Sequence, residues 1–246
     1  MATWPVWPWY LRRLRDGSDE PWCLLALATF FALLWSAEKT KPIEISLHRA
    51  TVWIALYCCT VPTLPPIFRA ATALLALGDT LCTIRRGDKP RLAYYALLLM
   101  ATPAFASLDF IAGFPLRYLA SHASAVLLNL AGIVVEPQGT LLRWGTRLVE
   151  VDAPCAGIRM LYGGIWTAAS LAAYYEFRSV RTAIALCLGL ATVIAANVLR
   201  TSALFFPEAG IVQLPHWTHA GVGLAVFAMA GAFLCWSASR LRSLAV

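Results

Sequence analysis

One cysteine of the seven in the chain differs from the others by its position. Six lie inside or at the ends of apolar runs, where a small buried side chain is the ordinary explanation: Cys23, Cys58, Cys59, Cys82, Cys187 and Cys235. Cys155 instead precedes an apolar run, and Pro154 is typical of a helix start. The unpaired N–H groups of a helix start favour a thiolate, as does Arg159 four residues later, while Asp152 opposes it. Cys155 is therefore a candidate nucleophile, and the alternative is an ordinary residue at the membrane interface.

A cysteine nucleophile requires a base and a group that stabilises negative charge, and two residues could supply them. Arg200 ends an apolar run, which is an expensive place for a charge unless it faces protein or water. The alternative for Arg200 is a side chain that snorkels to the membrane surface. His219 begins the last apolar run, and a histidine there can exchange protons near neutral pH or be a solvated polar end. We predict that both belong to one site with Cys155.

A metal site is a weaker interpretation of the same residues. His216 and His219 are one helical turn apart, but no third ligand is evident beyond Cys155 or Glu208. We therefore predict no metal. Nothing in the sequence suggests a nucleotide loop, an organic cofactor or a nucleic-acid partner.

The composition shows what kind of scaffold must position these residues. Of the 246 residues, 60% are apolar and 13% are charged, and the mean hydropathy is +0.67. A soluble domain carries about a quarter charged residues and could not bury this much apolar surface. The net charge of +7 comes from basic clusters between apolar runs, which is typical of membrane topology. We predict an all-α polytopic membrane protein.

Seven apolar runs are long enough to be considered as transmembrane helices: 21–37, 50–68, 70–84, 92–116, 160–175, 182–199 and 220–239. We predict a bundle of about seven spans. Six is the alternative, because Pro62, Pro65 and Pro66 could turn residues 50–84 into one span and a re-entrant piece.

The basic clusters predict which ends of the runs face outward. Clusters at residues 85–91, 178–181 and 240–242 belong on the cytoplasmic side, so Cys155, Arg200 and His219 all fall on the outer face. On that face, apolar residues at helical spacing over 116–130 predict an amphipathic interfacial helix, and residues 134–150 predict a short β-hairpin.

These segments define the expected organisation of a single membrane domain, residues 1–246. Residues 1–20 form an aromatic-rich interfacial segment without the features of a removable signal peptide. Residues 113–154 form an outer-face cap, and residues 155–240 form the catalytic spans.

These residues resemble the exosortase and archaeosortase family of integral-membrane cysteine transpeptidases. The resemblance rests on three motifs: Cys155-Ala156-Gly157-Ile158-Arg159, Asn197-Val198-Leu199-Arg200, and His219 with Gly223 and Phe227. They are similar to the family's Cys-small-Gly-aliphatic, Asn-x-x-Arg and His-x-x-x-Gly-x-x-x-Phe patterns. The match covers roughly residues 90–240. Histidine at the third position resembles the bacterial branch, and the low span count resembles a short or divergent member of a family usually described with eight spans.

The resemblance implies a protein-sorting reaction at the outer face of the cytoplasmic (inner) membrane. Its substrates are exported proteins whose C-terminal signal has a short motif, often Pro-Glu-Pro, then a hydrophobic helix and a basic tail. Cys155 would attack the scissile carbonyl and form a thioester, and His219 would transfer protons. Arg200, helped by Arg159 and oriented by Asn197, would stabilise the oxyanion. The substrate helix would dock from the membrane lipid, and an unknown acceptor amine would receive the new carboxyl end.

Two other interpretations remain open. Water could replace the acceptor amine, which would make the protein a plain protease. A non-enzymatic transporter, or an assembly partner of a polysaccharide export system, could use Asp79, Asp109 and Arg200 as polar groups in a pathway. No inverted repeat supports the transporter interpretation.

Overall fold

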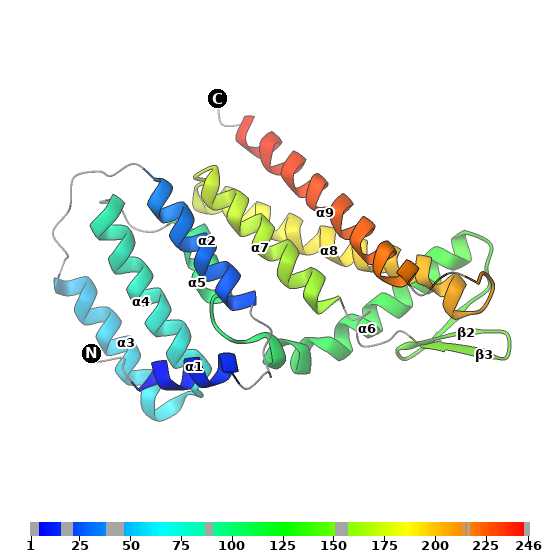
Figure 1. The fold of residues 1–246 in the computed structure, drawn as a ribbon, viewed down its shortest axis with the longest axis horizontal. Coiled ribbons are helices and arrows are strands. Elements are labelled where there is room, and N and C mark those ends of the chain that lie inside the picture. Colours follow the sequence, from blue (N-terminus) through cyan, green and yellow to red (C-terminus); the bar gives the residue numbers. More distant parts are fainter. Residues whose placement is uncertain are drawn as a thin grey trace. The chain divides into compact units, whose positions relative to one another are not determined.

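The computed structural model describes residues 5–15, 22–37, 47–86, 91–150, 157–213, 215 and 217–243. They are mostly helical and belong to two compact units (Figure 1). The N-terminal unit is Met1–Ala106 with Ala169–Ala185, and the C-terminal unit is Ser107–Ala168 with Leu186–Val246. The expected division into an interfacial segment, a cap and catalytic spans of one domain stays a prediction.

The N-terminal unit is a set of helices packed in pairs. Helix α3 packs on α4, α4 on α5, α2 on α5, and α1 on α4 (Figure 1). The Tyr10 hydroxyl of α1 donates a hydrogen bond of 2.7 Å to the Ala101 carbonyl, which fixes this short helix to the end of α5. The helices are α1 (Val6–Arg15), α2 (Trp22–Ser36), α3 (Leu47–Thr63), α4 (Pro66–Arg86) and α5 (Leu92–Met100).

A buried carboxylate joins three of these helices. Asp79 of α4 is 4% exposed and forms an ion pair with Arg49 of α3. Trp53 Nε1 and the Tyr95 hydroxyl also donate to it, at 3.1 and 2.8 Å. A charge buried in an apolar setting is tolerated when it is paired and hydrogen-bonded in this way. Asp79 therefore has a clear role in holding α3, α4 and α5 together.

The C-terminal unit contains the helices that carry the predicted site. Glycines let α7 approach its neighbours closely: a Cβ at Gly163 would lie 2.8 Å from Phe227 of α9, and one at Gly164 would lie 2.1 Å from Val193 of α8. Small residues at helix contacts are typical of membrane proteins, where close packing replaces the hydrophobic effect. This unit contains most residues of α6 (Phe105–Leu130), α7 (Ile158–Tyr174) and α8 (Ser179–Glu208), and all of α9 (Trp217–Ser243).

A small antiparallel sheet lies beside α6 and the end of α8. The strands β1 (Glu136–Gln138), β2 (Leu141–Trp144) and β3 (Arg147–Glu150) follow in the order β1-β2-β3, with Leu142 opposite Val149. We expected a hairpin of two strands, whereas the structure has three. The reason is that Gly139 and Gly145, at φ 65° and 60°, each provide a tight turn. The sheet is a three-stranded meander.

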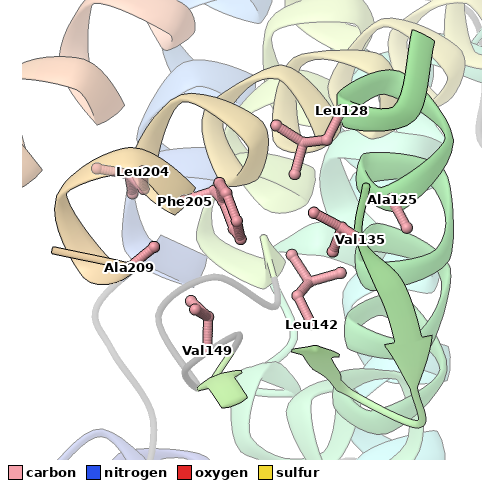
Figure 2. Packing of buried hydrophobic residues seen from close by; sticks show 8 residues of the cluster. All are labelled: Ala125, Leu128, Val135, Leu142, Val149, Leu204, Phe205 and Ala209. Carbon is pink, nitrogen blue, oxygen red and sulfur yellow. The ribbon is translucent and has the colours of Figure 1, made fainter. Parts of the chain in front are cut away.

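A hydrophobic cluster attaches this sheet to both helices. Figure 2 shows Leu142 and Val135 on the sheet side, Leu128 and Ala125 on α6, and Phe205 on α8, gathered around one centre. The cluster also contains Val149, Leu204 and Ala209. The sheet therefore positions the end of α8.

Three of the described helices are long and apolar enough to cross a membrane, judged by length and composition: α4, α8 and α9. The pair α5 and α6 would make a fourth span if it is one broken segment. The helical membrane architecture is thus supported, but the count of seven spans is not confirmed. The other predicted runs form shorter helices, since α2 has 15 residues and α3 and α7 have 17 each.

The expectation of one continuous helix over residues 92–116 was wrong. Helix α5 ends at Met100, α6 begins at Phe105, and the two are bent by 96°. Pro103 lies in the break, has no N–H to donate, and disfavours helical backbone at Thr102 before it. The predicted amphipathic helix over 116–130 is the second half of α6.

Candidate functional site

Gly157 is the first residue of the first motif that the structure describes, because residues 151–156 lie outside the described part of the chain. The predicted nucleophile Cys155 is among them, as is Asp152; His216 also lies outside the described residues. Gly157 has φ +74°, and a Cβ there would lie 2.7 Å from Cγ of Asn197. The Gly157 carbonyl accepts a bond of 2.7 Å from Leu161 N–H, which begins α7. Glycine is required at this position both by its backbone and by the side chain that lies against it.

Asn197 and Arg200 lie one turn apart on α8 and are both buried. Asn197 is 5% exposed and Arg200 is 8% exposed. The snorkelling interpretation of Arg200 is therefore wrong, because a snorkelling side chain carries its charged end to water. A buried guanidinium in an apolar helix is costly unless protein groups surround it. Arg200 is therefore a strong candidate for a functional group.

The third motif surrounds this guanidinium. Nη2 of Arg200 lies 3.5 Å from Nε2 of His219 at the start of α9. A Cβ at Gly223, one turn further along α9, would lie 3.1 Å from Nε of Arg200. Gly223 therefore makes room for the guanidinium, and the structure brings together four residues of two separate motifs: Asn197, Arg200, His219 and Gly223.

One residue near His219 was not recognised from sequence as its partner. Oε1 of Glu208, the last residue of α8, lies 3.5 Å from Nδ1 of His219. From sequence, Glu208 was a candidate only for a metal ligand, because no spacing rule relates the end of one helix to the start of the next. Among the residues that the structure describes, no group of three or more His, Cys, Asp and Glu side chains could hold a metal ion.

Arg159, predicted to help Arg200, lies in the first turn of α7, and its side chain is exposed. The structure thus gives it a different environment from that of Arg200, which is buried. Its role in oxyanion stabilisation stays a prediction.

An apolar pocket borders the first and second motifs. It is small and is lined by residues of α6, α7 and α8: Leu116, Leu119, Ala120, Gly157, Leu161, Val193, Ile194, Asn197 and Val198. The Ser124 hydroxyl of α6 donates to the Val198 carbonyl at 3.2 Å and helps hold α6 beside α8. Asn197 contributes the polar side chain of this apolar lining.

The other cysteines differ from expectation. Cys23 and Cys82 are buried, whereas Cys58, Cys59, Cys187 and Cys235 are exposed on the surfaces of apolar helices. The interpretation of all six as buried was wrong because apolar runs place residues on every face of a helix, and one face meets the surrounding medium. All six described cysteines are free thiols.

A family model for the transmembrane exosortases matches residues 2–236, almost the whole chain. The chain belongs to the transmembrane exosortase family. No curated protein and no solved structure matches it. The match extends well beyond residues 90–240, to which the motifs pointed, and includes the N-terminal helices.

Membership in the family supports a membrane transpeptidase role in general, on protein substrates that carry sorting signals. It favours an enzyme over a transporter. The Asp79 cluster agrees with this, because its three donors give that carboxylate a structural role.

Proposed function

We propose that this protein is a membrane-embedded cysteine transpeptidase that cleaves the C-terminal sorting signal of exported proteins and transfers them to an acceptor amine. The observation that carries the proposal is the buried guanidinium of Arg200 beside His219, with Gly223 making room for it. Such a pair offers a fixed positive group for a developing oxyanion and a ring that can transfer protons. Gly157, two residues after Cys155, lies against Asn197 one turn from Arg200.

In the acylation step, the Cys155 thiol gives its proton to Nε2 of His219, and the electron pair stays on sulfur. The thiolate attacks the scissile carbonyl carbon, and Arg200 stabilises the negative charge that forms on its oxygen. The C–N bond then breaks, the leaving amine takes the proton from His219, and a thioester of Cys155 remains.

In the transfer step, the acceptor amine attacks the thioester and loses a proton to His219. The C–S bond breaks, and the Cys155 thiolate leaves and is reprotonated. Asn197 orients Arg200, and Arg159 assists it. The substrate's membrane helix lies in the lipid beside the enzyme. The site faces the outer side of the inner membrane, and the motif is Pro-Glu-Pro or similar.

The test is co-expression with an exported reporter that ends in a Pro-Glu-Pro motif, a hydrophobic helix and a basic tail. Wild type should shorten the reporter, and mass spectrometry should locate the cut near the motif. Cys155→Ala and Cys155→Ser should leave the reporter intact. Cys235→Ser, which changes an exposed thiol of α9, is the matched control and should process fully.

Processing that persists in both Cys155 variants would exclude the nucleophile. Arg200→Gln should lower the rate by roughly 100-fold or more, the usual effect of removing one oxyanion donor. Arg200→Lys keeps the charge but loses the planar guanidinium with its fixed set of N–H donors. A wild-type rate in this variant would therefore exclude the specific role of the guanidinium.

A further inference from the structure

The imidazole of His219 lies between two groups of opposite charge. Its Nδ1 atom lies 3.5 Å from Oε1 of Glu208, and its Nε2 atom lies 3.5 Å from Nη2 of Arg200. Both distances exceed an ordinary N–H to O hydrogen bond by about 0.5 Å, and catalytic contacts often shorten when a substrate binds. Each ring nitrogen therefore has its own partner.

These partners favour one tautomer of the neutral ring. A carboxylate can only accept hydrogen bonds, and a guanidinium can only donate them. A neutral imidazole that satisfies both must carry its proton on Nδ1, facing Glu208, and its lone pair on Nε2. The nitrogen with the lone pair is the one that can remove a proton from a thiol.

The carboxylate also matters once that proton has moved. An imidazolium next to the buried guanidinium of Arg200 would place two positive charges side by side. A carboxylate on the far side of the ring offsets this repulsion. Glu208 thus favours both the tautomer that accepts the proton and the charged ring that results.

The fold holds Glu208 in place from the opposite side. Helix α8 ends immediately after it: Ala209 N–H bonds to the Phe205 carbonyl at 2.8 Å, and Gly210 takes φ +71°. Nη1 of Arg147 in β3 donates to the Ala209 carbonyl at 2.7 Å. Phe205 and Ala209 are buried in the cluster with the sheet (Figure 2). The sheet therefore holds the backbone at the end of α8, from which the Glu208 side chain extends to His219.

We propose that Glu208 is a positioning residue that holds His219 in the tautomer with its proton on Nδ1, so that the lone pair of Nε2 can take a proton and return it. This rests on the proposed function of His219 in proton transfer. Glu208 acts through the ring and does not touch the substrate. The three-stranded sheet contributes by holding the backbone at the end of α8, next to this residue.

The first test is ¹⁵N NMR of the full-length protein labelled on histidine, in detergent micelles. The His219 signals are identified by their loss in His219→Gln. Wild type should show a protonated Nδ1 and an unprotonated Nε2. Glu208→Leu cannot accept a hydrogen bond and should gain the form with the proton on Nε2, while Asp109→Asn, which alters an exposed carboxylate of α6 in the same unit, should give the wild-type spectrum. Unchanged His219 signals in Glu208→Leu would overturn the proposal.

The second test measures kcat and KM with a peptide that carries the sorting motif. Glu208→Gln should lower kcat roughly 10- to 100-fold with little change in KM, in the range of general acid–base effects. Glu208→Asp should recover part of the loss, and Asp109→Asn should lose nothing. A wild-type kcat in Glu208→Gln would refute a role in the reaction.

The two experiments separate this inference from the proposed function. If wild type does not process the peptide but Glu208→Leu shifts the tautomer, the proposed function fails and the contact between Glu208 and His219 stands. If wild type is active and the Glu208 variants match it in both spectra and rate, the inference fails and the proposed function stands.

Discussion

At position 157, a residue with a Cβ would have an unfavourable backbone conformation and too little space for its side chain. Its φ is +74°, and a Cβ would lie 2.7, 2.8 and 2.9 Å from Cγ, Oδ1 and Nδ2 of Asn197. Asn197 is 5% exposed, so its amide has little room to move away. We therefore expect Gly157→Ala to destabilise the protein through two separate effects.

The two effects have different magnitudes and can be separated. A left-handed backbone costs a residue with a Cβ about 1–2 kcal/mol, and overpacking a buried contact costs about 1–3 kcal/mol more. Gly157→Ala should thus lower the free energy of unfolding by roughly 2–5 kcal/mol by these two terms. Gly132→Ala is the matched control, because Gly132 has φ +87° and no atom within 4 Å of a Cβ. It should show the backbone cost alone.

The assay is unfolding by denaturant titration of the purified protein in micelles. Adding Asn197→Ala to Gly157→Ala removes the steric conflict, so the double variant should be more stable than the sum of the single effects, by about 1–3 kcal/mol. Reporter processing should also fall in Gly157→Ala, since the change displaces Asn197 beside Arg200. Equal losses in Gly157→Ala and Gly132→Ala, with no coupling to Asn197→Ala, would refute the reasoning.

Two further predictions concern α9 and α4. Gly223→Ala should lower the processing rate, because its Cβ would lie 3.1 Å from Nε of Arg200. Gly221→Ala, whose Cβ meets its nearest atom at 3.7 Å, should gain about 0.5–1 kcal/mol of helix stability without loss of rate. Equal rates in the two variants, compared at saturating reporter, would contradict this account. Asp79→Asn should lower the free energy of unfolding by about 3 kcal/mol, because it leaves the partly buried Arg49 without its charged partner. The control is Asp109→Asn, at an exposed position, which should change the free energy of unfolding by less than about 0.5 kcal/mol. Denaturant titration measures both changes, and similar values would exclude the structural role of Asp79.

Much of the scaffold was predictable because it follows from local chemistry. Apolar runs of about 20 residues predict membrane helices, since backbone groups in lipid must pair within the segment. On this basis the helices at 66–86 and 217–243 were expected within about four residues, whereas the helix at 179–208 continues nine residues beyond the predicted end at residue 199. The break at Pro103 was missed because it depends on which of several prolines ends a helix: Pro115 and Pro62 lie inside helices, whereas Pro103 does not.

The sequence by itself determined the membrane class, the three motifs and the family to which they point, because these depend on residue types and short spacings. The tertiary structure decided what surrounds each group. It buries Arg200, places His219 and Gly223 against it, and brings Glu208 to the other side of the ring. Those contacts join residues of different helices, and their geometry is set by where α8 ends against the sheet. No spacing along the chain encodes that position, because it results from packing between segments far apart in sequence.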